Sequence, residues 1–331
     1  MNRLFAILSI ACFLLCSGCD RLALLPQEDA DLQPAYAKAC DLLKEGKLEE
    51  AYPLFLSLGD YKDSALHASK FTYLPTEILA QDDGFGEEMV YYKTTYSYDE
   101  KGHLLKGEGA YANEEGPGYS EEHTYDKEGV LIRSETISEA GESVLTYEYN
   151  DKGQLTKRVG YTNGANVGGI TQYAYDEQGN CTLAETDSFL GVDPAEYETM
   201  EPYHTSKTTY TYNEQGLCTK AEESLGENGI YTYTVDYNTF HLPTRFTHTD
   251  NDGYSSETVF EYDEQGRCTK VDTDYDLAEF TYGESDLPTS AIRTRDGGKP
   301  CKVTYTYQLF YLEEAPQIPF FLEEYLSGPE V

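Results

Sequence analysis

Tyrosine and other apolar residues alternate with polar residues through most of the chain, from about residue 96 to about residue 290. The clearest stretch is Tyr210-Thr-Tyr-Asn-Glu-Gln-Gly-Leu-Cys-Thr-Lys220, and close copies begin at Tyr96, Tyr147, Tyr173 and Phe260. An alternation with a period of two is typical of an antiparallel strand that buries one face, and tyrosine and threonine favour strands. The pattern predicts a mainly β protein built as a twisted antiparallel meander.

Each repeat carries a turn signal after its second tyrosine. These tyrosines stand at positions 98, 125, 149, 175, 212, 237, 262 and 282, and a usual step of about 25 residues indicates a repeat array. Aspartate or asparagine can cap such a turn, and glycine at the fourth position can adopt positive φ, so each repeat is predicted to be a β-hairpin. The predicted turn residues are Asp99, Gly102, Asp126, Gly129, Gly153, Asp176, Gly179, Asn213, Gly216, Asp263 and Gly266.

Folding each hairpin about its turn predicts which residues face each other. In the first hairpin the register pairs Tyr98 with Leu104 and Tyr96 with Lys106. Across the repeats, this register places an apolar slot of Leu, Cys or Pro opposite the second tyrosines and a row of basic residues opposite the first aromatic residues. We expect the basic stems to cover the tyrosine rings. The alternative is a face of open rings that stacks on sugars.

These hairpins resemble the YD repeats of the RHS family, whose motif is a Tyr-Asp hairpin with glycine closing the turn. The resemblance covers residues from about 96 to about 290. It implies a spiral or shell-like β-sheet, which in large toxins of the family encloses a cargo domain. Eight repeats are expected to enclose little, so we do not expect the cargo role in this chain.

The first residues have the pattern of a signal peptide, with a basic start, an apolar run and small residues before a cysteine. The apolar run, of about 13 residues, is too short to span a membrane comfortably. Leu15-Cys-Ser-Gly-Cys19 resembles a bacterial lipobox, with Cys16 where leucine is usual. The resemblance implies cleavage before Cys19 and a lipid on that residue, and therefore an extracytoplasmic protein anchored at the cell membrane or cell surface. An ordinary cleaved signal peptide is the alternative.

A short segment before the repeats has helical periodicity instead. Gly46-Lys-Leu-Glu-Glu-Ala-Tyr-Pro-Leu-Phe55 resembles half of a tetratricopeptide hairpin, and Gly59-Asp-Tyr-Lys-Asp-Ser64 predicts a turn into a third helix. One such repeat cannot bury its own apolar face, so we expect it to cover a strand edge of the sheet. The predicted organisation is a signal peptide at 1–18, a tether at 19–33, the helical segment at 34–75, the repeat sheet at 86–308 and a C-terminal cap at 309–331.

Charge limits the partners of this chain. Its 60 acidic and 24 basic residues give a net charge of −36 at pH 7. Such a field repels nucleic-acid phosphates and anionic lipid headgroups, whereas it attracts cations and basic peptides. We therefore expect no nucleic-acid partner.

Motifs for catalysis and for cofactors are missing from the sequence. The six histidines are scattered, and neither an HExxH nor a GxSxG motif occurs. We therefore expect neither enzyme activity nor a cofactor.

Two further residue sets could bind metal or form disulfides. The aspartates of 250–252 and 272–276 offer oxygen donors for Ca²⁺, but neither set completes an EF-hand loop, and turn capping is the favoured interpretation. Cys181, Cys218 and Cys268 occupy equivalent hairpin slots that lie too far apart for direct pairing, so we expect buried free thiols.

One long step between repeats contains an insertion from Glu185 to Lys207. Long loops on rigid sheets often carry binding residues, so Phe189, Tyr197 and Tyr203 are the candidate binding residues. The first functional hypothesis is a binding or adhesion module for a glycan or a cationic peptide. The alternative is a scaffold that presents its helical segment to partner proteins.

Overall fold

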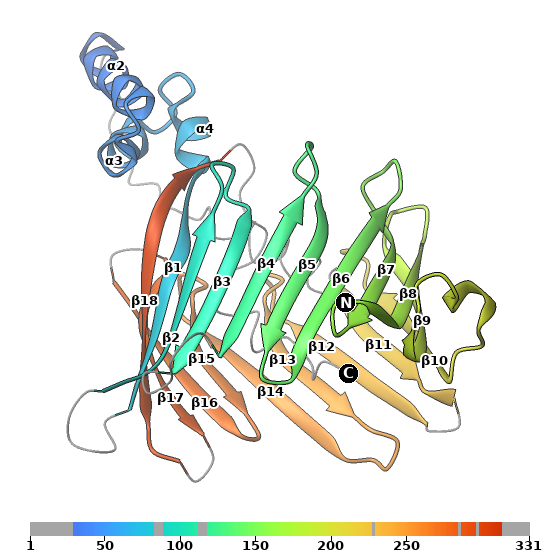
Figure 1. Cartoon of the computed structure of the whole chain (residues 1–331). Helices are drawn as coiled ribbons and strands as arrows, with labels where there is room; N and C mark the ends of the chain where they lie inside the picture. Colours follow the sequence, from blue (N-terminus) through green and yellow to red (C-terminus); the bar gives the residue numbers. More distant parts are fainter. Residues whose placement is uncertain are drawn as a thin grey trace.

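The computed structural model describes residues 29–82, 89–111, 118–226, 229–283, 286–295 and 298–312. Three helices precede one large antiparallel sheet (Figure 1). The helices are α2 (Asp29–Lys44), α3 (Leu48–Leu58) and α4 (Ser64–Ser69). Within the described residues, none of these is long and apolar enough to cross a membrane. The predicted signal peptide, Cys19 and most of the predicted C-terminal cap lie outside the described ranges.

Eighteen strands form the sheet, and each pairs antiparallel with its neighbours in the sequence. The last strand pairs with the first, so the sheet closes on itself, as Figure 1 shows. The mainly β class and the antiparallel meander are confirmed. The strands are β1 (Phe71–Asp82), β2 (Met89–Tyr98), β3 (Leu104–Tyr111), β4 (Tyr119–Tyr125), β5 (Leu131–Ser138), β6 (Gly141–Tyr149), β7 (Leu155–Thr162), β8 (Asn166–Tyr175), β9 (Cys181–Val192), β10 (His204–Tyr212), β11 (Cys218–Ser224), β12 (Ile230–Tyr237), β13 (Pro243–Thr249), β14 (Ser255–Tyr262), β15 (Cys268–Thr273), β16 (Asp276–Tyr282), β17 (Pro288–Arg295) and β18 (Cys301–Tyr311).

Three boundaries differ from those that the sequence predicts. The smallest difference is at the end of the sheet, where β18 runs to Tyr311, inside the predicted cap. Helix α2 begins at Asp29, inside the predicted tether, although Pro34 lies within it. The sheet begins at Phe71, well before residue 86, because β1 follows α4 almost directly. The predicted helical segment therefore ends with the first residues of the sheet.

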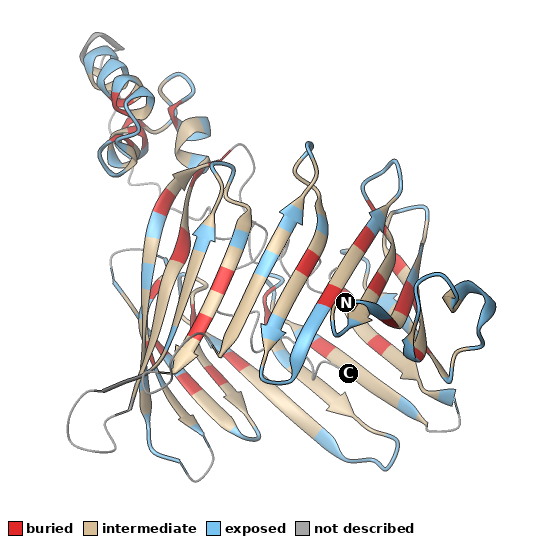
Figure 2. Cartoon of the chain, viewed as in Figure 1, coloured by how far each residue is buried: buried red, intermediate tan, exposed pale blue. Residues whose placement is uncertain are grey.

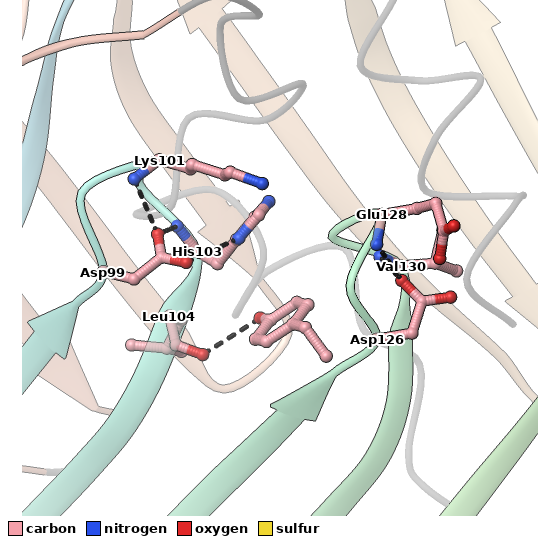
Figure 3. A network of polar contacts seen from close by, with 8 residues as sticks. Asp99, Lys101, His103, Leu104, Asp126, Glu128 and Val130 are labelled. Carbon is pink, nitrogen blue, oxygen red and sulfur yellow. Dashed lines mark hydrogen bonds and ion pairs between the residues drawn. The ribbon is translucent and has the colours of Figure 1, made fainter.

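The hairpin turns are held by side-chain caps (Figure 3). The Asp99 carboxylate accepts hydrogen bonds from the backbone N–H groups of Lys101 at 2.8 Å and His103 at 2.9 Å. Gly102 has a φ of 78°, a conformation that a residue with a side chain rarely adopts. The same pair of backbone bonds recurs at Asp126, Asn150, Asn213, Asn238, Asp250 and Asp263.

A β-bulge follows the first pair of each hairpin and changes the register. Tyr98 pairs with Leu104 as predicted, but the next pair is Ser97 with Lys106, so Leu105 is left as an extra residue. Threonine fills this bulge in most repeats, and its hydroxyl donates to a backbone carbonyl eight residues earlier, at 3.1–3.3 Å. These threonines are Thr156, Thr182, Thr219, Thr244, Thr269 and Thr289.

The bulge moves the basic row to the face opposite the tyrosines. Lys106 pairs across the strands with Ser97, not with Tyr96, and it forms ion pairs with Glu108 at 2.9 Å and Glu122 at 3.4 Å. The predicted covering of the first tyrosine rings by basic stems is therefore wrong. The basic residues lie on the outer surface, where exposed ion pairs contribute little stability but keep the sheet hydrated.

The second tyrosines connect each repeat to the one before it. Their hydroxyls donate to the backbone carbonyl of the apolar slot in the preceding repeat, at 2.6–3.0 Å. This set, called the tyrosine ladder below, comprises Tyr98, Tyr125, Tyr175, Tyr212, Tyr237, Tyr262, Tyr282 and Tyr307. Figure 3 shows one of these bonds, which ends on the Leu104 carbonyl. Burial raises the pKa of the Tyr212 and Tyr282 hydroxyls, which therefore remain protonated donors.

The two ends of the sheet together form one more repeat. Tyr307 of β18 pairs with Pro75 of β1, as a second tyrosine pairs with its apolar slot, and Thr76 occupies the bulge. The Thr76 hydroxyl donates to the Thr306 carbonyl at 3.3 Å, and the Tyr98 hydroxyl donates to the Pro75 carbonyl at 2.7 Å. The sheet therefore closes through a split repeat whose strands come from opposite ends of the sheet.

The sequence carries a signal for this closing strand at the end of the predicted helical segment. Leu74-Pro-Thr76 repeats the triplets Leu242-Pro-Thr244 and Leu287-Pro-Thr289, which both begin the second strand of a hairpin. The triplet therefore marks β1 as half of a repeat.

The helices cover the rim at which the closing strands end. Helix α3 buries Ala51, Phe55 and Leu58, and these residues cluster with Phe71 of β1 and Leu309 of β18. We expected the helices to protect an open strand edge. Since β1 and β18 pair with each other, no edge is open there, and the helices instead cover the end of the β1–β18 pair.

The tyrosine ladder predicts a stability loss for Tyr262→Phe. The change removes the donor from the fully buried Pro243 carbonyl, which Tyr262 reaches at 2.7 Å, and should cost about 1 to 3 kcal/mol. Urea unfolding would measure it. Tyr254→Phe is the control, because that hydroxyl lies 2.7 Å from the hydroxyl of Tyr275 and both residues are exposed. Equal losses in the two variants would show that the ladder does not stabilise the sheet.

The turn caps predict a loss of stability in acid. Burial opposes ionisation of Asp176, but hydrogen bonds from Asn180 outweigh it and hold the pKa of the carboxyl below its ordinary value. Its contribution is therefore present above the unfolded-state pKa and is lost as pH falls through the folded-state pKa. Asp176→Asn, which copies the uncharged Asn150 turn, should reduce the fall in unfolding midpoint between pH 5 and pH 3. An unchanged acid dependence would contradict this role.

Candidate ligand-binding cavity

The closed sheet encloses a cavity of about 600 Å³. Its walls come from eight successive strands, β6 to β13. In Figure 1 these strands lie on facing sides of the closed sheet, so the cavity is on the concave inner face. The expectation that the repeats enclose little is wrong. The volume lies within the range of small-molecule binding sites.

Small residues hollow the inner face at this place. Three successive cross-strand pairs cross this region. They join Gly160 of β7 to Gly169 of β8, Gly169 to Ser188 of β9, and Ser188 to His204 of β10. Glycine leaves no side chain to fill the interior, and all four residues line the cavity. Figure 2 shows that buried residues form only short bands along the strands.

Another part of the inner face is filled by apolar side chains. Phe260 and Phe280 pack there with Val271, Ala278 and Ala291 in one buried cluster. The cavity is therefore confined to one half of the closed sheet by the size of the inward residues.

A polar row crosses the cavity beside the glycines. Arg158, Thr171, Thr186 and Ser206 are successive cross-strand neighbours on β7, β8, β9 and β10. The Arg158 guanidinium donates to the Thr171 hydroxyl at 3.4 Å, and the Thr171 and Thr186 hydroxyls are 2.9 Å apart. The row offers hydrogen-bond donors and acceptors to any molecule inside.

Aromatic rings form the opposite wall. Tyr233 and Phe246 line the cavity with ring centroids 6.1 Å apart, and His248 stacks on Tyr233 with centroids 4.8 Å apart. Burial, together with the neighbouring Glu223 carboxylate, raises the pKa of Tyr233 to about 12. The cavity thus combines an aromatic wall with a row of hydroxyl groups.

The insertion lies at the rim opposite the hairpin turns. The capped turn of each repeat hairpin joins an even-numbered strand to the next odd-numbered one, whereas the insertion joins β9 to β10, as the Asp250 turn joins β13 to β14. In an antiparallel meander these two kinds of connection lie at opposite ends. The helices share the rim of the turns, so the insertion borders the far end of the cavity.

The three candidate binding residues of the insertion have different surroundings. Phe189 is 8% exposed, clusters with Val159 and Ile170, and also borders the cavity. Tyr197, in a 3₁₀ turn at Tyr197–Thr199, packs on this cluster, and the Lys157 amine donates to its hydroxyl at 3.4 Å. Tyr203 is 64% exposed and lines the cavity. The structure therefore brings Phe189 and Tyr203 to one cavity, whereas Tyr197 anchors the insertion.

Sequence reasoning did not identify the cavity residues Arg158, Gly160, Thr171 and Tyr233. The alternation of the strands indicates that Thr171 and Tyr233 share a face with other ring-bearing positions. It does not indicate that β7 and β12 face each other across a closed interior, because closure depends on the split repeat.

The other candidate residues have local structural partners. Cys181, Cys218 and Cys268 are buried free thiols, as predicted, and burial raises the pKa of Cys218 to about 11. Asp250 caps a turn, and Asp276 pairs with Arg293 at 2.5 Å. Within the described part of the chain, no group of three or more His, Cys, Asp or Glu residues is arranged to hold a metal ion.

Comparison with known families agrees with this architecture. The family model of the teneurin YD-shell matches residues 67–289. The chain belongs to this YD-shell family. The matched range begins before β1, so it includes the strand that supplies half of the split repeat.

Several solved structures are similar to this YD shell. The chain in the crystal structure of TcdB2-TccC3-Cdc42 is 13% identical with a TM-score of 0.32, over 70% of the YD-shell protein and 16% of that chain. Porin-like proteins from Bacteroides uniformis and Bacteroides vulgatus are 12% and 10% identical, with TM-scores of 0.38 and 0.36. These matches cover 70% and 71% of the YD-shell protein, and 96% and 98% of the porin-like chains. The protein thus spans about one sixth of the toxin-complex chain, and no curated protein matches its sequence.

Proposed function

We propose that this YD-shell protein is a non-catalytic, membrane-anchored binding module that holds a glycan in the cavity between β6 and β13. The observation that carries the proposal is the pairing of aromatic rings with a hydroxyl row around one cavity of about 600 Å³. Protein sites for sugars combine ring faces, on which the C–H faces of a sugar stack, with polar side chains that bond its hydroxyls.

The cavity favours a glycan over a cationic peptide. A peptide attracted by the net charge of −36 would meet the acidic outer face first. The inner polar row instead carries Arg158, which repels a cationic group. Tyr203, exposed at the insertion rim, is the proposed entry contact.

The proposed anchor is a lipid on Cys19, which would place the shell outside the cytoplasmic membrane. Support comes from the lipobox-like residues Leu15 to Cys19 after an apolar run. A short tether and one tetratricopeptide-like hairpin would then connect the membrane to the shell. The second hypothesis, a scaffold that presents this hairpin to partner proteins, has less support, because α3 buries Ala51, Phe55 and Leu58 against its own neighbours.

A glycan array with the purified protein tests the binding proposal. Gly160→Val should weaken binding, because a Cβ fits there with Leu145 Cδ2 3.5 Å away while the branched side chain projects into the cavity. Tyr203→Ala should weaken binding, whereas Leu190→Ala, at an 83% exposed position in the same segment, is the control. Tyr197→Ala should lower stability more than affinity. Failure of every glycan to bind a folded protein would refute the proposal.

Metabolic labelling tests the anchor. Expressed in a bacterium with lipoprotein processing enzymes, the protein should incorporate labelled palmitate and appear in the membrane fraction. Cys19→Ala should lose both the label and the membrane association, whereas Cys40→Ala should keep them. Label in the Cys19→Ala variant, or none in the parent, would contradict the anchor.

A further inference from the structure

Arg158 is unusual among the described arginines because no described carboxylate forms an ion pair with it. Four of the five other described arginines pair with a carboxylate at 2.5–2.8 Å, and these are Arg133, Arg245, Arg267 and Arg293. The fifth, Arg295, is exposed to solvent, unlike Arg158. The contrast is sharp in a chain with 60 acidic and 24 basic residues, in which a carboxylate partner would be easy to supply.

The position of Arg158 makes this charge costly to the folded protein. The residue is half-buried on the inner face, between Tyr147 of β6 and Thr171 of β8. Its described hydrogen bond, to the Thr171 hydroxyl at 3.4 Å, is long and uses one of five donors. A charge that is withdrawn from water without a counter-ion destabilises a protein, so an anionic ligand would recover part of this cost.

A second polar group close to Arg158 also lacks a partner. The Tyr173 hydroxyl is buried and, among the described residues, has no hydrogen-bond partner of ordinary geometry, although the Thr171 side chain is a near polar neighbour. Tyr173 lines the same cavity, two residues along β8 from Thr171, so both side chains lie on the inner face. A guanidinium and an unpaired hydroxyl therefore point to one position for a ligand group that accepts several hydrogen bonds.

The acidic group in the cavity does not occupy this position. Glu223 of β11 lies beside Tyr233, on the aromatic wall, and contributes to the raised pKa of that tyrosine. The cavity thus separates a cationic end at Arg158 from an acidic and aromatic end at Glu223. A sugar ring on Tyr233 would direct a negative substituent toward Arg158.

We propose that Arg158 selects a carboxylate-bearing sugar, such as a hexuronate or sialic acid unit, as the ligand of the cavity. This inference rests on the proposed glycan function and specifies its ligand class. A planar guanidinium matches the two oxygens of a carboxylate, and such charge-assisted pairs are stronger than neutral hydrogen bonds. Thr171, Thr186 and Ser206 then supply hydroxyls for the sugar beside its carboxylate.

The test compares acidic oligosaccharides with the same oligosaccharides after reduction of their carboxyl groups to alcohols. Calorimetry on the purified full chain should give at least about tenfold tighter binding for the carboxylated form. Arg158→Gln should lower the affinity for the carboxylated form toward that for the reduced form, so that the ratio between the two affinities falls close to one. Arg158→Lys keeps the positive charge but loses the planar guanidinium that can bond both carboxylate oxygens, so its affinity for the carboxylated form should lie between those of the parent and Arg158→Gln. Arg133→Gln, on the outer face, is the matched control.

Two results would overturn the inference, and they differ in what else they refute. Equal binding of both forms by the parent, unaffected by Arg158→Gln, would leave the glycan function in place but remove the carboxylate selection. Binding of neither form, in a protein with a normal unfolding midpoint, would refute both proposals. Tighter binding of sulfated sugars than of carboxylated ones would also overturn the assignment, because a different anion would then be the ligand.

Discussion

The closed sheet depends on hydrogen bonds between tyrosine hydroxyls and the backbone of the preceding repeat. Each bond of the tyrosine ladder crosses from one hairpin to the next, for example from Tyr212 to Cys181 and from Tyr237 to Cys218. Most of the slot residues are buried, so water cannot satisfy their carbonyls, and the tyrosine hydroxyls do so instead. Each of these tyrosines therefore belongs to its own hairpin and also bonds the preceding hairpin through its hydroxyl. Phenylalanine lacks this hydroxyl, which explains why tyrosine recurs there.

The bulge beside each turn decides which residues face the interior. The residues nearest the turn pair as counting along the chain predicts, as Tyr98 and Leu104 do. One extra residue then shifts every later pair, so the basic row moves outward. Sequence counting missed this shift, because it assumed an uninterrupted ladder. The threonine in each bulge was visible in the sequence, but its bond to a carbonyl across the hairpin depends on the bent backbone.

The class of fold could be predicted, but the cavity could not. Repeats with Tyr-x-Tyr and a capped turn specify hairpins through local chemistry alone. Closure requires β1 and β18 to meet, and the cavity requires Gly160 and Gly169 to face an aromatic wall five strands away along the sheet. Such contacts are set by the curvature of the whole sheet. For the same reason Tyr203 could be identified from its insertion, whereas Arg158 could not.

The split repeat has a consequence for the order of events during synthesis. Thr76 and Thr306, which meet in the seam, are 230 residues apart in the chain, whereas the strands of each other repeat are joined by one short turn. The hairpins can therefore form one by one as the chain leaves the ribosome. The edge of β1 that does not pair with β2, however, stays unpaired until β18 has been made. Until then it is an open strand edge, able to pair with another copy or with a chaperone. The last residues of the sheet thus convert a growing curved ribbon into a closed shell.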